Sequence, residues 1–395
     1  MIRDLYYPES IIPNQIQHYL LKAACSDFNT AVSYWGKLKI LLNLSDISNM
    51  KVDSTVLALI YDKLDHMSTS LLPMVYYNLR QLEDPLLQSI KSYYHYLWAK
   101  NHYFLSVAQK FINDSSNCKS RITLLKGLAI AFYYSPDPAI RVMNDVDILI
   151  NPAEFDSVLA NLPSSYCLKA PYKREKLLGF LHSATYLFNN KLEVDVHWQV
   201  AHHIADWNPY NENNAFLETK FEKLDVLEPT RAFFHSIIHG TIPNVCSTVR
   251  WISDCYLIQK NHEINWRLLI DFAKKYDHIY QLNMGLNILK EYICIPNEVL
   301  LEINILRINS LQIKYTKKLQ NIFSISKQYK DVDNEGFKDK LAKKWISISI
   351  LYYHRLAFNR VSFVDNLKDK IIFTGYLIYI VLRKIKRVLI AKLFS

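Results

Sequence analysis

Two aspartates two positions apart, Asp145 and Asp147, are the residues of this chain best suited to metal chemistry. They lie in the mostly apolar segment 142–150, which is typical of a buried β-strand. A strand places residues i and i+2 on the same face, so both carboxylates would share one small volume. Like charges that close are costly unless a cation neutralises them, and hard oxygen ligands favour Mg²⁺ or Mn²⁺. The pair therefore predicts a divalent-metal site.

A second strand-like segment, 191–198, carries three more ionisable side chains. Polar and apolar residues alternate there with period two, so Glu193, Asp195 and His197 share a face. The apolar opposite face explains how the strand is anchored, but it does not explain three adjacent ionisable groups. They are expected to line a cleft, although an exposed edge strand of a half-buried sheet would show the same alternation.

The turn at Lys126-Gly127 is the candidate phosphate contact. The chain has only seven glycines, and neither a Gly-rich P-loop nor a G-x-G-x-x-G pattern is present. Gly127 follows the apolar run 122–125 and precedes an expected helix over 128–134. The missing Cβ would let a phosphate approach the backbone at a helix N-terminus, and Lys126 would add a positive charge. A plain strand-to-helix turn with a solvated lysine is the alternative.

Several motifs, taken in order, resemble the uncharacterised bacterial nucleotidyltransferase family of the polymerase-β-like superfamily. They are Leu-Leu-Lys-Gly at 124–127, Arg141 with Asp145-x-Asp147, and Val-Asp-Val-His-Trp at 194–198. The likeness covers roughly residues 30–275, including segments 98–103, 239–240, 249–254 and 264–266. The wider superfamily usually has Gly-Ser at the turn, whereas the resembled family carries Lys-Gly as this chain does.

The resemblance implies an α+β fold, with a small mixed-sheet core flanked by N-terminal and C-terminal helical regions. It also implies that Asp145 and Asp147 bind metal and that Asp195 supplies the third carboxylate. The predicted protein is then a Mg²⁺- or Mn²⁺-dependent nucleotidyltransferase. Two cations about 3.5–4 Å apart would stabilise the attacking and leaving oxygens.

The predicted reaction transfers a nucleoside monophosphate from a nucleoside triphosphate, with ATP the expected donor, and releases pyrophosphate. The unknown acceptor would offer a hydroxyl on a peptide, protein, sugar or small metabolite, and Asp195 would accept its proton. Nucleotide-binding roles are predicted for Lys126, Gly127 and Arg141. For Arg141, an ion pair with Asp137 or Asp145 is the structural alternative.

Roles beside the acceptor or around the metal ligands are predicted for Glu193 and His197, with His197 orienting Asp195. Two other classes of function remain open: a nucleotide-binding interaction protein without turnover, and a glycosyltransferase that uses Asp-x-Asp. In the latter, Asp195 would be irrelevant.

Two helical patterns are predicted to be structural. The spacing of His235 and His239 suits zinc, but the glutamate of H-E-x-x-H is missing, so helix packing is expected. Trp251 is expected to be buried beside an i, i+4 ion pair between Arg250 and Asp254.

The pattern divides the chain into three regions: an N-terminal helical lobe over 1–115, a catalytic core over 116–227 and a C-terminal helical region over 228–395. Glu228-Pro229-Thr230 reads as a helix start, and a connecting helix is expected over 154–162. With 395 residues, half of them hydrophobic, the chain can bury two or three cores.

Composition favours a cytoplasmic protein. The start has no signal-peptide pattern, and the six cysteines are scattered without a C-x-x-C pair, which suits a reducing compartment. The net charge of +10 comes without a recognisable nucleic-acid-binding module. The basic, apolar tail 371–395 has two open interpretations: peripheral contact with the inner membrane face as an amphipathic helix, or packing on the catalytic lobe.

Overall fold

The computed structural model describes residues 8, 11–44, 54–115, 121–169, 182–201, 204, 207–221, 223–242 and 249–328. The chain divides into two compact units. The first comprises residues 1–242 and 246–308, and the second comprises 243–245 and 309–395. Helix α15 (Ser310–Gln328) belongs to the second unit, and every other element described below belongs to the first.

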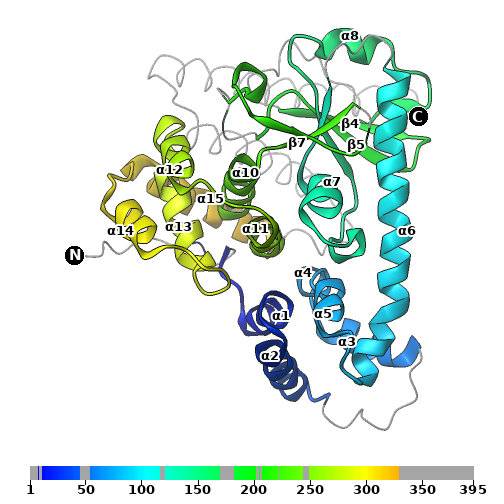
Figure 1. Cartoon of the computed structure of the whole chain (residues 1–395), viewed down its shortest axis with the longest axis vertical. Helices are drawn as coiled ribbons and strands as arrows, with labels where there is room; N and C mark the ends of the chain where they lie inside the picture. The colour runs from blue at the N-terminus through cyan, green and yellow to red at the C-terminus, as the bar shows by residue number, and fades with distance from the viewer. Residues whose placement is uncertain are drawn as a thin grey trace, which may run out of the picture. The chain divides into compact units, whose positions relative to one another are not determined.

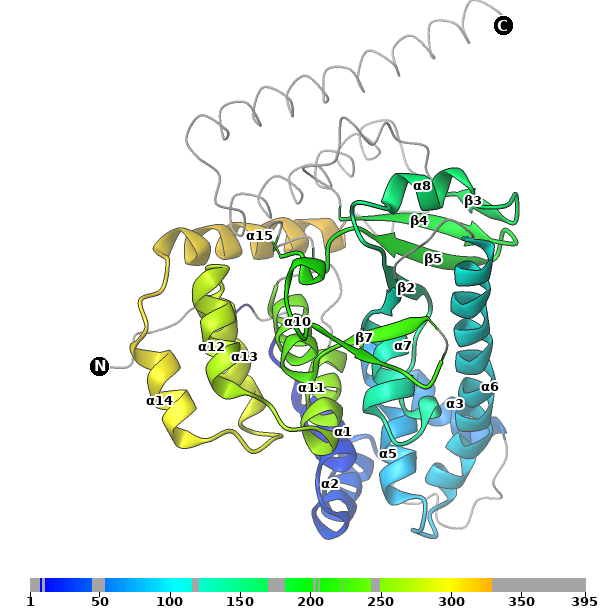
Figure 2. The same cartoon turned by 45° about the horizontal axis from the view of Figure 1, so that its top comes forward.

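The first unit is built on a seven-stranded mixed sheet (Figure 2). In spatial order its strands are β3 (Tyr166–Leu168), β4 (Ser183–Phe188), β5 (Leu192–His197), β2 (Val146–Leu149), β1 (Ile122–Leu124), β7 (Leu224–Leu227) and β6 (Phe216–Glu218). The pairs β2–β5 and β1–β7 are parallel, and the other neighbours are antiparallel. This mixed sheet with flanking helices confirms the predicted α+β class.

The two motif strands are neighbours at the centre of the sheet. Their register pairs Val146 with Val194, Asp147 with Asp195 and Ile148 with Val196. The aliphatic side chains of these pairs are fully buried. Because side chains alternate along a strand, Asp147 and Asp195 lie together on the opposite face.

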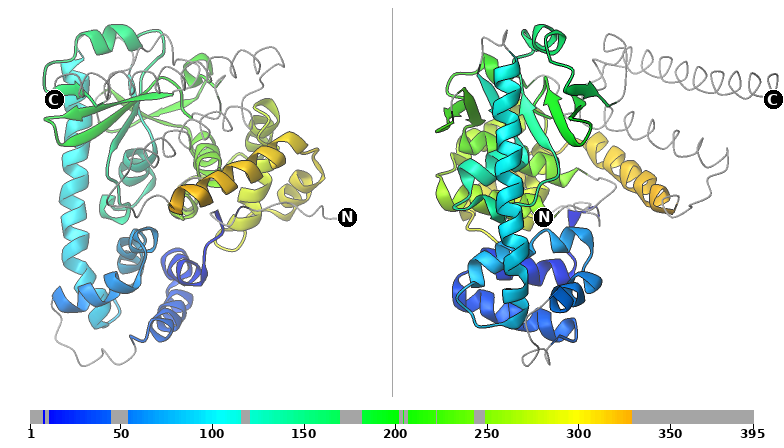
Figure 3. Two further views of the ribbon diagram at one scale, coloured as in Figure 1. Left: turned by 180° about the vertical axis from the view of Figure 1, so that it is seen from behind. Right: turned by 90° about the vertical axis from the view of Figure 1, so that its right-hand side faces the viewer.

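The N-terminal helices precede the sheet. They are α1 (Gln15–Cys25), α2 (Phe28–Leu41), α3 (Ser54–Lys63), α4 (His66–Thr69), α5 (Leu72–Leu79) and α6 (Pro85–Asp114). The 30-residue α6 packs on α3 and α5 and continues to β2 and α7, as Figures 1 and 3 show. It thereby joins the N-terminal helices to the sheet in one unit.

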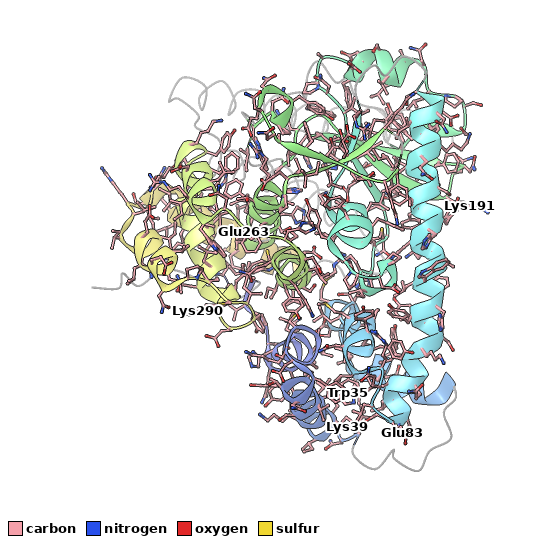
Figure 4. All side chains as sticks on the ribbon, in the orientation of Figure 1. Trp35, Lys39, Glu83, Lys191, Glu263 and Lys290 are labelled. Atoms are coloured by element: carbon pink, nitrogen blue, oxygen red, sulfur yellow. The ribbon has the colours of Figure 1, made fainter. Side chains whose placement is uncertain are left out.

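The N-terminus of α6 is fixed by the buried carboxylate of Asp84. Its Oδ1 accepts hydrogen bonds from the backbone of Leu86 and Leu87, which caps the helix. Its Oδ2 accepts from Trp35 Nε1 at 3.2 Å and pairs with Lys39 at 2.5 Å, and Figure 4 labels both α2 residues. The Asp84 side chain thus caps the start of α6 and also holds α2 against it.

Five helices follow the sheet in the first unit. They are α10 (Pro229–Thr241), α11 (Arg250–Asn261), α12 (Trp266–Lys275), α13 (Ile279–Leu289) and α14 (Asn297–Ile305). As predicted, α10 starts after Glu228, whose carboxylate caps it. A Cβ on Gly240 would lie 2.0 Å from Trp251 Cγ, so the glycine allows the close packing of α10 on α11. Helix α10 also contacts β7.

The segment after the Lys126 turn is helical, as predicted, but irregular. Helix α7 (Lys126–Ala129) continues as a π-helical turn over Ile130–Tyr134. Helix α8 (Phe155–Ala160) lies within the helix predicted over 154–162. None of the helices in the described ranges is both long enough and apolar enough to span a membrane.

The predicted boundaries at 115/116 and 227/228 fall between elements, because α6 ends at Asp114 and α10 starts at Pro229. Both boundaries lie inside the first compact unit. The three-region division therefore stays a prediction. The tail 371–395 lies outside the described residues.

Candidate functional site

Three side chains from the two central strands meet at one point. Ligand atoms of Asp147, Asp195 and His197 all lie within 4.8 Å of one another. Two ligands bound at about 2.0–2.6 Å to one ion are separated by no more than about 5 Å, so this group can hold a divalent cation. The parallel register places Asp147 directly beside Asp195, and His197 follows two residues later on the same face of β5.

Lys126 lies over this group with its ammonium 2.6 Å from Asp147 Oδ1. Its backbone φ is 43°, in the left-handed region that a side chain rarely adopts. Burial alone would lower the pKa of Lys126. The negative charge of Asp147, with smaller contributions from Asp145 and Asp195, outweighs this effect, so the pKa of Lys126 is raised above its usual value. The lysine is therefore a permanent cation at this site.

Asp147 is almost completely buried and strongly paired. Burial would raise the pKa of its carboxyl, but Lys126 and His197 outweigh that effect and hold the pKa well below its usual range. The carboxylate is thus ionised at any physiological pH. An ionised carboxylate is the form that a hard cation binds.

The other two predicted carboxylates lie nearby. Thr185 on β4 donates to Asp195 Oδ1 at 2.5 Å, which fixes that side chain. Asp145 lies just before the start of β2, and burial, followed by the charge of Asp147 and then that of Asp195, raises its pKa. The structure brings all three aspartates within electrostatic reach of one another, but Asp145 is not in the metal-ligand group. The metal-binding roles of the three aspartates stay a prediction.

His197 and Glu193 differ from their predicted surroundings. The ring Nε2 of His197 lies 2.9 Å from Asp147 Oδ1, so the histidine contacts Asp147 instead of orienting Asp195. Its side chain is completely buried, and its Nδ1 has no hydrogen-bond partner. Glu193 pairs with Lys169, with its side chain about two-fifths exposed, and it is not in the metal-ligand group.

The space beside Gly127 is filled by protein. A Cβ added there would lie 3.0 Å from Met143 Cβ, so the glycine permits the close approach of the segment that leads into Asp145. The left-handed φ that glycine would tolerate belongs instead to Lys126. Both residues of the turn border the cavity described below, and their contact with a nucleotide stays a prediction.

Arg141 has a different partner from either one proposed for it. Its guanidinium donates to both carboxylate oxygens of Asp254 on α11, at 2.6 and 3.0 Å. The expected pair between Arg250 and Asp254 is therefore wrong, because Asp254 is taken by Arg141. Instead, Arg250 Nη1 donates to the carbonyl of Val142 at 3.1 Å. The two arginines together tie α11 to the segment before β2.

A cavity of about 160 Å³ opens between these elements. Lys126, Gly127, Asp145 and Asp147 border it from the sheet side, together with Arg141. A second set borders it from α10 and α11: His235, Ser236, His239, Arg250, Trp251 and Asp254. Asp147 belongs to the metal-ligand group and also borders this cavity, so the two features share one carboxylate.

The histidines and Arg250 were not predicted to belong to the site. The i, i+4 spacing of His235 and His239 was visible in the sequence, but because the glutamate of a zinc motif is missing, both were predicted to serve helix packing. In the structure the two ring centroids are 6.2 Å apart, and both residues face the same cavity. The i, i+4 spacing of the two histidines therefore identifies the polar face of α10 that borders the cavity.

Comparison with known proteins agrees with this arrangement. The sequence profile of a family described as "Uncharacterised nucleotidyltransferase" matches residues 66–293, more than half of the chain. The match includes α6, the whole sheet, and α10 and α11. No curated protein and no solved structure matches the chain significantly.

Proposed function

The chain belongs to this family of uncharacterised nucleotidyltransferases, and we propose that it transfers a nucleoside monophosphate from a nucleoside triphosphate to an acceptor hydroxyl, releasing pyrophosphate. ATP is the expected donor. The acceptor is a peptide, a protein, a sugar or a small metabolite. Family membership leaves the glycosyltransferase alternative without support.

One observation carries the proposal: Asp147 and Asp195 are paired in register on adjacent parallel strands, beside a cavity bordered by cationic side chains. Carboxylates gathered on one face of a sheet suit a divalent cation, and cations around a cavity suit a polyphosphate. Transfer between a triphosphate and a hydroxyl needs both features at one place.

The donor set fits Mg²⁺ or Mn²⁺. Asp145, Asp147 and Asp195 would supply hard carboxylate oxygens, and such ligands favour these two ions over softer metals. We assign His197 a positioning role, because its hydrogen bond to Asp147 holds that carboxylate in one orientation. Bound cations would stabilise the charge that develops on the attacking and leaving oxygens.

The chain's own residues perform the remaining steps. Lys126 places a positive charge beside Asp147, where the phosphate nearest the reaction would bind. Asp195, held by Thr185, accepts the proton of the acceptor hydroxyl. Arg141 fixes α11 through Asp254 and so shapes the cavity in which the nucleotide lies.

The test is Asp147→Asn, which keeps the size of the side chain and removes its charge. We expect pyrophosphate release from a triphosphate, with Mg²⁺ or Mn²⁺ and cell extract as the acceptor source, to fall by about a thousandfold or more. Labelled triphosphates followed into product, with self-labelling scored as well, give the measurement. Asp271→Asn is the matched control, because Asp271 is half-exposed on α12 and pairs with the exposed Arg267.

Retained transfer in a folded Asp147→Asn variant would refute the catalytic assignment. Tight triphosphate binding by the wild type without any turnover would instead support the interaction-protein alternative. Thermal unfolding of each variant separates loss of chemistry from loss of the fold.

A further inference from the structure

The α11 side of the cavity contains a largely buried cation without a carboxylate partner. Within the described part of the chain, Arg250 donates one hydrogen bond, to the carbonyl of Val142, and its buried Nε has no partner. Among the described residues, no carboxylate forms an ion pair with it, whereas Asp254 neutralises the neighbouring Arg141. A buried charge is costly unless it is paired, so this guanidinium suits an anionic ligand.

Arg250 stays charged at physiological pH. The nearby Arg141 guanidinium, followed by burial, lowers the pKa of Arg250 to about 10, while Asp254, Asp145 and Asp147 act in the opposite direction. Of these carboxylates, Asp254 is bound directly to Arg141, and none forms an ion pair with Arg250 among the described residues.

His235, on α10, adds a second unpartnered polar group. It is 4% exposed, and its Nε2 has no hydrogen-bond partner. Burial, followed by His239 and Lys126, holds its pKa well below 6.5, so the ring is neutral. A neutral imidazole can donate one N–H to a phosphate oxygen, and unsatisfied buried polar atoms in native proteins call for such an explanation.

The size of the cavity limits what it can hold. One buried water needs about 10–15 Å³ of comparable volume, whereas pockets for whole drug-sized ligands span about 300–1,000 Å³. At about 160 Å³ the cavity suits part of a nucleotide. The cationic and imidazole groups on the α10–α11 side fit phosphates better than they fit a base.

We propose that Arg250, with His235 and His239 beside it, binds the outer two phosphates of the nucleoside triphosphate and holds the pyrophosphate leaving group. This inference rests on the proposed function, since it assigns the far end of the same site. Within the site, the α-phosphate lies beside the aspartates and the outer phosphates extend towards α11.

The chemistry explains why a cation belongs there. A bond forms between the acceptor oxygen and the α-phosphorus while the bond from that phosphorus to the oxygen bridging to the β-phosphate breaks. The bridging oxygen keeps the electron pair, and the acceptor's proton passes to Asp195. Negative charge therefore accumulates on the pyrophosphate, where charge-assisted hydrogen bonds from Arg250 stabilise it.

The experiment compares the full-length wild type with Arg250→Gln by isothermal titration calorimetry in EDTA. The probes are inorganic tripolyphosphate, ATP and AMP. We expect the variant to bind tripolyphosphate and ATP about ten- to hundredfold more weakly, because a hydrogen-bonded charge is lost. AMP lacks the outer phosphates, so its affinity stays within about twofold. A merely structural role for Arg250 would not produce this selectivity.

Two further variants keep the test informative. Arg267→Gln removes an arginine that is three-quarters exposed on α12, and it leaves all three affinities unchanged. Arg250→Lys keeps the positive charge but loses the planar fork of donors, so it gives an intermediate loss and serves if Arg250→Gln does not fold. Thermal unfolding verifies each fold.

Three results would overturn the inference: no tripolyphosphate binding by the wild type, equal binding by folded Arg250→Gln, or an equal loss of affinity for AMP. Asp147→Asn separates this inference from the proposed function. If that variant loses transfer while Arg250→Gln binds tripolyphosphate normally, only the present inference fails. If it keeps transfer while Arg250→Gln loses tripolyphosphate, the catalytic assignment fails and the phosphate site stands.

Discussion

At the scale of single residues, the site depends on how Asp147 is neutralised. Lys126 and His197 both contact its Oδ1, and the carboxylate is almost completely buried. Removing one partner of a buried charge leaves the other uncompensated, which costs more than the pair contributes when intact. The residue that forms this ion pair, Lys126, also has a left-handed backbone conformation.

The buried His235 makes stability depend on pH. Its pKa is held well below 6.5 in the folded protein, whereas an unfolded histidine titrates at about 6.5. Below that pH the unfolded chain binds a proton that the folded chain does not, so the free energy of unfolding falls as pH falls. Between about pH 7.5 and 5.5 this residue alone accounts for about 1.4 kcal/mol.

His235→Gln should remove that contribution, so the difference in stability between wild type and variant should shrink by about 1.4 kcal/mol over the same pH range. Urea unfolding at a series of pH values measures it. His66→Gln, at an exposed position, controls for the loss of an imidazole elsewhere. Parallel stability curves for wild type and His235→Gln would contradict the assignment.

The site residues differ in how far the sequence could identify them. Asp147, Asp195 and His197 were predictable because strand periodicity fixes which side chains share a face. The Arg141–Asp254 pair was not, because 113 positions separate the two residues and only the packed fold brings them together. Likewise, local rules place a left-handed φ on Gly127, whereas tertiary contacts impose it on Lys126.

At the scale of elements, the packing of α10 on α11 shapes one side of the cavity, and Gly240 allows the two helices to approach each other closely. We predict that Gly240→Ala destabilises the protein by about 1–3 kcal/mol or more, because the new Cβ would lie 2.0 Å from Trp251 Cγ and the helices must separate. Chemical unfolding gives the magnitude.

A matched glycine provides the control. Gly36 lies within α2 with nothing within 4 Å of its would-be Cβ. Gly36→Ala should therefore stabilise the protein by about 0.5–1 kcal/mol, because alanine is the better helix former. Equal effects at the two positions would show that the helix–helix contact is not limiting.

Elements with a strong pattern were predictable, and those defined by distant partners were not. The strands around Asp147 and Asp195 and the start of α10 follow from alternation and capping, and the structure has them within a few residues. Strand β7 pairs with β1, which is distant in the sequence, and β6 joins the sheet through its hairpin with β7. Strand β2 is as short as β7, but the Asp145-x-Asp147 motif drew attention to it, whereas β6 and β7 carry no such motif and too little periodicity to be recognised.

At the scale of the whole molecule, burial sorts the described cysteines into two classes. Cys25 and Cys255 are buried, and burial raises the pKa of each thiol far above its ordinary value. Cys167 and Cys294 are exposed. Since the thiolate is the reactive form, the exposed pair should be the only ones of these four described cysteines that react in the native protein.

Peptide mapping by mass spectrometry after timed maleimide labelling tests this prediction. We expect Cys167 and Cys294 to react about a thousandfold or more faster than Cys25 and Cys255, whose labelling requires opening of the fold. Labelling in denaturant should equalise the four rates. Native-state reaction of Cys25 at the rate of Cys294 would contradict the burial of Cys25.

The ammonium of Lys126 gives the chain an internal counter-ion for the almost completely buried carboxylate of Asp147. The newly synthesised polypeptide can therefore complete its central sheet without first acquiring an ion from the cell. For the proposed metal-dependent enzyme, folding and metal binding are then separate steps, and a shortage of the metal would lower activity without unfolding the protein.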